Sequence, residues 1–346
     1  MCVLYQAREI ASRAFLLTWA TPLGLSASLT RLPIVFTLLV TSAIVPVAVT
    51  GENGMTDVLQ NWLRVRLNSQ PARSNPGAGP SSVTLLAYHF WEPARFDSQF
   101  DLVEGAVRET WAHCGMLKTV LVVNAVTPRL EAFAEASGGW VSLDRTDALV
   151  PGNIHSMSVD CNLSLHRRFD SEYVLVVQND GFPLRPGLDA FVGKWDFIGA
   201  PYVRNTWRNR LVCGAFNCWV SNGGFSLRSK RICELASHYW QKKYFSMPDC
   251  RAVSEDIFYT ETLPLRERDY RRSVRIADHA HALAFSFDAA FPYPGAMPPF
   301  GFHGVKAFED FLARGWVPEA SEGGTAYSFD LRGGRASGPA LPEHAE

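Results

Sequence analysis

The sequence predicts an α/β fold in which a mixed sheet is flanked by helices. Strand-like runs alternate with helical stretches between residues 83 and 183, and this alternation is typical of a sheet built from β–α–β units. In addition, residues 174–177 form a continuous apolar, mostly β-branched run, which suits a strand that is buried on both faces. We therefore expect a Rossmann-like sheet with a ligand site at the carboxyl edge of its strands.

The elements follow one another along the chain. Residues 83–90 and 119–124 are apolar runs of strand length. Between them, Asp97 or Ser98 can cap a helix of about five turns. The other predicted elements are a short helix at 128–137, a strand at 140–144, a helix at 153–169, shorter strands at 195–201 and 211–220, a tight turn into a helix at 222–229 and an irregular loop at 291–304.

The charge balance and the cysteines exclude several classes of protein. The chain of 346 residues has 33 basic and 34 acidic side chains, a formal net charge of −1. It therefore shows no electrostatic footprint of a protein that binds duplex nucleic acid. Its seven cysteines contain no Cys-x-x-Cys pair, which argues against a zinc ribbon or a thioredoxin-type site. We expect small buried cysteines in a reducing compartment, and hence a cytoplasmic protein.

Residues 1–54 form an N-terminal extension with few charges. No residue between Arg31 and Glu52 is charged, and this stretch is apolar and long enough to be considered as a membrane span. Three interpretations are open: a mis-assigned start codon, a membrane anchor and a long signal peptide. Met55 opens an amphipathic stretch, so it is a credible true start. Membrane association is expected only through residues 14–50, in the anchor interpretation.

The rest of the chain is predicted to have three parts. Residues 55–82 combine the amphipathic stretch with a segment rich in proline, glycine and serine, which is typical of a flexible linker. The folded domain is predicted to span residues 83–331. Residues 332–346 are predicted to be a disordered tail.

The central strand ends in a polar turn. Gln178, Asn179 and Asp180 follow its apolar run directly and precede the breaker Gly181. In an open α/β sheet, the carboxyl ends of the strands form the crevice that binds ligands. Asp180 therefore stands where an acid can hold a divalent cation and, through it, a diphosphate. The alternative is a strand that simply ends in a polar turn.

Three further motifs follow, and each also has a purely structural explanation. The NGG of SNGGFSLRS at 221–229 favours a turn with positive φ. The SED of SEDIF at 254–258 is typical of a helix start, where a cap is followed by acids. The histidine of FGFHG at 300–304 lies in a proline-rich loop, where it can be structural or exposed. The order of these motifs is more informative than any one of them.

Together, these motifs resemble a bacterial glycosyltransferase-like domain of the GT-A type, which has a nucleotide-diphospho-sugar transferase fold. WDFIGAP at 195–201 and the ED and HG pairs fall in the order of that family. The resemblance covers residues 83–311 in layout, and its specific motifs lie between Tyr173 and Gly304. It implies a hexosyltransferase-type enzyme that moves a sugar from a nucleotide-sugar donor to a hydroxyl acceptor, such as a glycan, with the help of Mn²⁺ or Mg²⁺.

The resemblance also implies roles for single residues. Its metal motif is commonly Asp-x-Asp, and QND keeps only the last acid, Asp180, while His303 matches a further metal ligand. A carboxylate and an imidazole suit Mn²⁺ better than Ca²⁺. Glu255 and Asp256 match an acidic pair that can supply the general base, and we favour Asp256 for that role. The acceptor side is matched by Asn222, Gly223, Gly224 and Arg228.

The nucleotide is expected at the same edge of the sheet. The first strand and the loop after it should hold the base and the ribose, with Tyr88 and Arg95 as candidates. Gln178 and Asn179 are expected beside the diphosphate, together with Asp180.

Two other functions are open. A nucleotidyltransferase shares this sheet, but it usually has a glycine-rich basic loop after the first strand, where this chain has HFWEPARF. A catalytically inactive sugar-binding domain is the second alternative, because the metal motif has lost its first acid.

Overall fold

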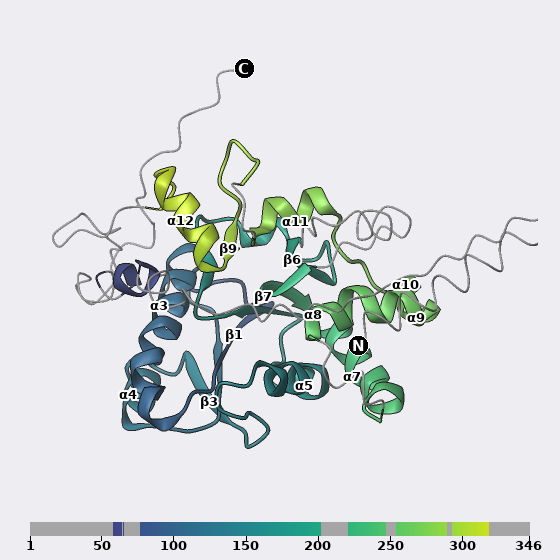
Figure 1. The fold of residues 1–346 in the computed structure, drawn as a ribbon, viewed down its shortest axis with the longest axis horizontal. Helices are drawn as coiled ribbons and strands as arrows, with labels where there is room; N and C mark the ends of the chain where they lie inside the picture. Colours follow the sequence, from purple (N-terminus) through teal and green to yellow (C-terminus); the bar gives the residue numbers. More distant parts are fainter. Residues whose placement is uncertain are drawn as a thin grey trace, which may run out of the picture. The chain divides into compact units, whose positions relative to one another are not determined.

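A six-stranded mixed sheet is the centre of the structure. The computed structural model describes residues 58–63, 65, 77–201, 221–246, 254–288 and 293–317. In this part of the chain the large sheet has the strand order β3-β2-β1-β4-β7-β6, with helices packed against it (Figure 1). A smaller, three-stranded sheet has the order β5-β9-β8. The predicted α/β class, a mixed sheet flanked by helices, is confirmed.

The large sheet is mixed because of β7. β1 pairs in parallel with β2 and with β4, and β2 pairs in parallel with β3. β7 runs antiparallel to both β4 and β6. The strands are β1 (Val83–His89), β2 (Thr119–Val123), β3 (Val141–Arg145), β4 (Tyr173–Val177), β6 (Phe197–Pro201) and β7 (Ser221–Ser229).

Strand β1 shows that the sheet is buried on both faces. Leu85 and Ala87 belong to one apolar cluster, while Leu86 and Tyr88 belong to another, because successive side chains of a strand point to opposite faces. Helices α3 and α4 complete the first cluster, and α5 and α7 complete the second (Figure 1). These helices are α3 (Phe96–Cys114), α4 (Pro128–Ala136), α5 (Ile154–Ser164) and α7 (Lys230–Tyr239).

The second half of the described chain is built from shorter elements. One helical run starts with α8, passes through a π-helical turn and ends with α9. In the small sheet, β9 pairs antiparallel with β5 and parallel with β8. These elements are β5 (Gly181–Pro183), α8 (Glu255–Ile257), the π-helical turn (Phe258–Thr262), α9 (Leu263–Arg266), α10 (Arg268–Ser273), α11 (His279–Phe285), β8 (Ser286–Phe287), β9 (Gly301–His303) and α12 (Val305–Ala313).

Three expectations about local structure are wrong. Helix α3 begins after Arg95, which makes no side-chain cap, so neither Asp97 nor Ser98 is the capping residue. The NGG motif lies inside strand β7 and not in a turn. The loop expected at 291–304 contains strand β9, because its apolar residues pair with the strand that follows Asp180.

Several expectations fall on residues that the structure does not describe. The extension at 1–54, the proline-rich stretch at 67–76, the strand expected at 211–220 and the tail at 332–346 lie outside the described residues. Within the described ones, none of the helices combines the length and the apolar character needed to cross a membrane.

The helical segment at residues 58–63 is part of the folded core. Trp62 and Leu63 are buried in the apolar cluster that covers the small sheet. The Trp62 ring stacks on Phe182 of β5, with 5.7 Å between the ring centroids. The folded domain therefore starts before Val83, the start expected from the sequence, because the amphipathic segment buries its apolar side against the small sheet.

Replacing Trp62 with alanine tests this packing. We expect Trp62→Ala to lower the free energy of unfolding by about 3–5 kcal/mol, the usual cost of removing a large buried aromatic side chain. Val58 lies on the same segment but is exposed, so Val58→Ala should change that free energy by less than about 0.5 kcal/mol. Urea denaturation measures both variants. Equal stabilities would show that the segment does not belong to the core.

Candidate functional site

His303 lies between two carboxylates at the end of the small sheet. β9 pairs with β5 so that His303 is opposite Gly181, the residue that follows Asp180. On the other side, the parallel register of β9 with β8 brings Asp288 next to His303. The Nε2 atom of His303 lies 3.2 Å from Asp180 Oδ1, and its Nδ1 atom lies 3.2 Å from Asp288 Oδ2. Strand pairing thus gathers three ionisable side chains from separate segments.

The imidazole of His303 is positively charged in this arrangement. Burial disfavours the charged ring, but Asp180 and Asp288 outweigh burial and raise the pKa of His303 to about 10. Burial also favours the neutral form of Asp180, yet the charge of His303 holds the pKa of Asp180 below its usual value. His303 is therefore a positively charged side chain held between two carboxylates.

Three side-chain atoms in this group could be ligands of a cation. His303 Nε2 lies 3.0 Å from Gln178 Oε1 and 3.2 Å from Asp180 Oδ1. Adjacent ligands of an octahedral Mg²⁺ lie about 3 Å apart, because each is about 2.1 Å from the metal. Asp180 Oδ1 is buried, and the ion pair with His303 Nε2 is its contact in the described part of the chain. An amide oxygen, a carboxylate and an imidazole therefore fit part of a coordination sphere.

These three atoms do not complete a metal site by themselves. Among the described residues, no three His, Cys, Asp or Glu side chains are grouped so that they could hold a metal ion. Any cation at Asp180 would need further oxygen ligands from a substrate and from water, as Mg²⁺ does when it is held by one or two carboxylates and the phosphates of a substrate.

Strand β7 bulges next to this group. Ala200 of β6 pairs with Asn222, while the preceding Gly199 pairs with Ser226. Residues 223–225 therefore have no counterpart on β6. Bulges of this kind bend a strand and change where its residues point, and they are over-represented beside active sites.

Both glycines of the bulge are in close contact with functional side chains. A β-carbon on Gly223 would come within 2.2 Å of Glu255 Oε1, and one on Gly224 within 2.1 Å of His303 Nε2. Neither glycine has φ in the left-handed region, so close approach explains them. Because neighbouring α-carbons are about 3.8 Å apart, Glu255 Oε1 and His303 Nε2 are at most about 11 Å from each other. The bulge therefore lies against both motifs, through two neighbouring residues of β7.

The guanidinium of Arg228 is enclosed by protein. It is fully buried between the rings of Phe197 and Tyr259, 5.2 Å from each ring centroid. Its Nη2 donates to Glu255 Oε1 at 3.2 Å and to Gly223 O at 3.1 Å. The predicted contact of Arg228 with an acceptor is therefore corrected, because the buried guanidinium instead holds Glu255 and the bulge in place.

The two acids at the start of α8 have different surroundings. Glu255 accepts hydrogen bonds from Arg228 at one carboxylate oxygen and from Ser158 Oγ at the other. Asp256 Oδ1 accepts a hydrogen bond from the backbone N–H of Ile257 at 2.7 Å. Burial, and next the charge of Glu255, raise the pKa of Asp256 to about 6. A carboxylate with this raised pKa is suited to accept a proton near neutral pH.

The residues expected to bind the nucleotide are not all at the surface. Tyr88 is 4% exposed and donates a hydrogen bond to Asp160 Oδ2. The prediction that Tyr88 binds the nucleotide is therefore corrected, because its hydroxyl belongs to the core. Arg95 is exposed, and its guanidinium lies 5.2 Å from the centroid of the Trp91 ring. Asn179 is half-buried.

Asp288 is the member of the site that sequence reasoning missed. It accepts a hydrogen bond from Asn222 Nδ2 as well as contacting His303, so Asn222 is also brought into the group. Asp288 directly follows the short strand β8, as the QND motif directly follows β4. An apolar strand that ends in an acid was thus a signal in both places.

One family model matches the segment of the chain that contains Asp180, Glu255 and His303. A family model described as "Protein of unknown function (DUF5672)" matches residues 155–303, from helix α5 to His303. No curated protein matches the sequence.

Three solved structures similar to the chain are glycosyltransferases. The mannosyltransferase PcManGT from Pyrobaculum calidifontis, in complex with GDP-Man and Mn²⁺, has 16% identity and a TM-score of 0.29, over 52% of this chain and 56% of that chain. Mouse xyloside xylosyltransferase 1 in its apo form has 10% identity and a TM-score of 0.41, over 64% of this chain and 97% of that chain. The mannosyltransferase Ktr4p from S. cerevisiae has 8% identity and a TM-score of 0.36, over 61% of this chain and 74% of that chain. This chain spans little more than half of PcManGT.

Alanine substitutions test the close approach at the bulge. Gly223→Ala and Gly224→Ala should each lower the free energy of unfolding by about 1–3 kcal/mol, the usual cost of overpacking. A β-carbon on Gly77 would have no atom within 4 Å, so Gly77→Ala is the matched control and should cost nothing. Thermal denaturation compares the three variants. A Gly224→Ala protein as stable as Gly77→Ala would show that His303 does not lie against the bulge.

Proposed function

We propose that the chain is a glycosyltransferase of the GT-A type that moves a sugar from a nucleotide-diphosphate donor to a hydroxyl acceptor. The observation that carries this proposal is the bulge of β7, where Gly224 lies against the His303 group and Gly223 lies against Glu255 of the acidic pair. Sugar transfer needs the charge of a leaving diphosphate to be neutralised and a proton to be removed from the acceptor. One group suits each task, and both lie against neighbouring residues of β7.

The donor side is built around Asp180. We assign Asp180 Oδ1, Gln178 Oε1 and His303 Nε2 as the atoms that would hold Mn²⁺ or Mg²⁺, a ligand mix of oxygen and imidazole that suits these ions. When bound, the cation supplies charge neutralisation to the diphosphate as a Lewis acid. His303 must first lose its Nε2 proton, because only the neutral ring is a metal ligand.

The acceptor side is built around Asp256. Its pKa, raised to about 6, leaves it ionised at neutral pH but more basic than an ordinary aspartate. It can therefore take the proton of the attacking hydroxyl, as a carboxylate does in an inverting displacement. Glu255 does not share this task, because Arg228 and Ser158 occupy its oxygens. It fixes a negative charge beside Asp256 and so keeps Asp256 basic.

A panel of nucleotide-diphosphate sugars tests the proposal. Each is added to the protein with and without Mn²⁺, and the melting temperature is measured, because a bound ligand stabilises the native state by an amount set by the ratio of its concentration to its dissociation constant. One sugar that stabilises only with Mn²⁺ and is transferred to a hydroxyl acceptor would support a glycosyltransferase. Stabilisation without transfer to any acceptor would indicate an inactive sugar-binding domain. No response to any sugar would contradict both.

The acidic pair gives the first kinetic prediction. Asp256→Asn should keep the fold and donor binding, but its turnover number should fall by about 10²–10⁴, the usual contribution of a general base. Glu255→Gln keeps acceptor oxygen for Arg228 or Ser158 but removes the charge, so its turnover number should fall less. Steady-state kinetics and thermal denaturation are measured on the same samples. A loss below about threefold in both variants would remove the pair from catalysis.

The raised pKa of Asp256 also predicts the pH profile. Asp256 must be ionised to accept a proton, so kcat/KM should fall as the pH drops through about 6, where Asp256 becomes protonated. Neutralising Glu255 in Glu255→Gln removes a cause of the raised pKa, so this acid limb should move to lower pH. An acid limb at the same pH in both proteins would assign it to another group.

The donor side gives a separate prediction. Asp180→Ala and His303→Ala should each abolish the stabilisation that Mn²⁺ adds to nucleoside-diphosphate binding. The double variant should be no worse than either single variant, because all three lack the same ion. Metal dependence that is unchanged in His303→Ala would take His303 out of the ligand set.

A further inference from the structure

We propose that Asp288 is a positioning residue that sets the direction of the His303 ring and couples it to the bulge of β7. This inference rests on the proposed function, since it assigns His303 Nε2 to a cation on the donor side. Asp288 does not touch a substrate in this assignment. It acts through His303 on one side and through Asn222 on the other.

The geometry around one oxygen atom carries the proposal. His303 Nδ1 lies 3.2 Å from Asp288 Oδ2, and Asn222 Nδ2 donates to the same Oδ2 atom. The Oδ1 atom of Asn222 in turn accepts a hydrogen bond from the backbone N–H of Gly224, at 2.7 Å. A continuous chain of contacts therefore runs from the His303 ring, through Asp288 and Asn222, to the glycine against which that ring lies.

The backbone places Asp288 in the same way. β8 pairs in parallel with β9 up to Phe287 and Phe302, so the next residue on each strand is Asp288 and His303. Gly304 has φ of 92°, and a β-carbon there would lie 3.1 Å from Asp288 Oδ1. The glycine after His303 thus leaves room for this carboxylate. Sheet register, and not a chance rotamer, brings Asp288 to the ring.

The contact of Asp288 with His303 Nδ1 determines whether Nε2 of the same ring can be a metal ligand. A carboxylate that accepts the Nδ1 proton fixes the tautomer of a neutral histidine and leaves Nε2 free as a ligand. Here Nε2 is the atom that faces Gln178 and Asp180. Without Asp288, the ring could rotate or take the other tautomer, and Asn222, which accepts from the Gly224 N–H, would lose the carboxylate that orients it.

Direct measurement of cation binding tests this role without any turnover assay. Mn²⁺ is titrated into the full-length chain, alone and with a nucleoside diphosphate, and free Mn²⁺ is quantified by electron paramagnetic resonance against a protein-free sample. Asp288→Ala should weaken Mn²⁺ binding about 10–100-fold, the usual effect of losing a carboxylate behind a metal-bound histidine. Asp288→Asn keeps an oxygen that can accept from both His303 and Asn222, so it should recover a large part of the affinity.

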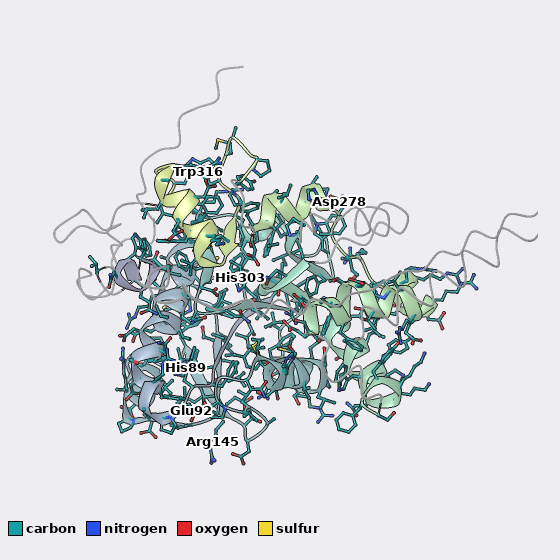
Figure 2. The ribbon with its side chains drawn as sticks, viewed as in Figure 1. His89, Glu92, Arg145, Asp278, His303 and Trp316 are labelled. Carbon is teal, nitrogen blue, oxygen red and sulfur yellow. The ribbon has the colours of Figure 1, made fainter. Side chains whose placement is uncertain are left out.

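A double-mutant cycle separates positioning from a general loss of structure. If Asp288 acts through His303, Asp288→Ala should have no further effect on Mn²⁺ affinity in a His303→Ala background. The matched control is Asp278→Ala, because Asp278 makes an Asp–His pair with His281 Nδ1 at 2.8 Å. Figure 2 shows Asp278, the capping residue before α11, away from His303. The control should bind Mn²⁺ as the wild type does.

The outcomes distinguish this inference from the proposed function. Loss of Mn²⁺ binding in His303→Ala but not in Asp288→Ala would overturn the role of Asp288 and leave the donor site standing. Wild-type affinity in His303→Ala, or no Mn²⁺ binding by the wild type either alone or with a nucleoside diphosphate, would overturn both. An equal loss from Asp288→Ala with and without His303 would show a structural effect and also overturn the positioning role.

Discussion

The antiparallel pairing of β5 with β9 is the constraint on which the site depends. It places His303 opposite Gly181, and it is extended by a hydrogen bond of 2.9 Å from Gly304 N to Asp180 O. Contacts between distant segments cost loop-closure entropy, and apolar packing offsets that cost. The Phe182 and Phe302 rings, one from each strand, meet at 4.7 Å between centroids. The stability of the small sheet therefore maintains the geometry of the charged group at its end.

The carboxylates of the site have two different positively charged partners, Arg228 in one group and His303 in the other. An unpaired buried charge is costly, so buried carboxylates need a partner. Arg228 supplies a permanent positive charge to Glu255, because a guanidinium does not lose its proton in proteins. His303 balances Asp180 and Asp288 with a proton that it can lose. The charge of the first group is therefore fixed, whereas the charge of the second depends on the proton of His303.

The sequence could predict the sheet and the acid at the end of its central strand, because apolar runs and their polar ends are local signals. It could not predict which face of a strand carries a polar group when both faces are buried. Tyr88 and Arg228 look like ligand residues in the sequence, yet both side chains are enclosed among core residues from the helices behind the sheet. The turn predicted at the NGG motif is wrong for a similar reason, since its glycines make room for side chains that approach from distant segments.

The loss of the first acid in QND does not leave the donor side short of charge. An Asp-x-Asp motif brings two carboxylates to the cation from one strand end. Here Gln178 is neutral, but β8 brings the second carboxylate, Asp288, to the opposite side of His303. With a neutral imidazole, Asp180 and Asp288 together carry two negative charges, which balance one divalent cation. The charge count around His303 is therefore compatible with the divalent cation of the proposed function.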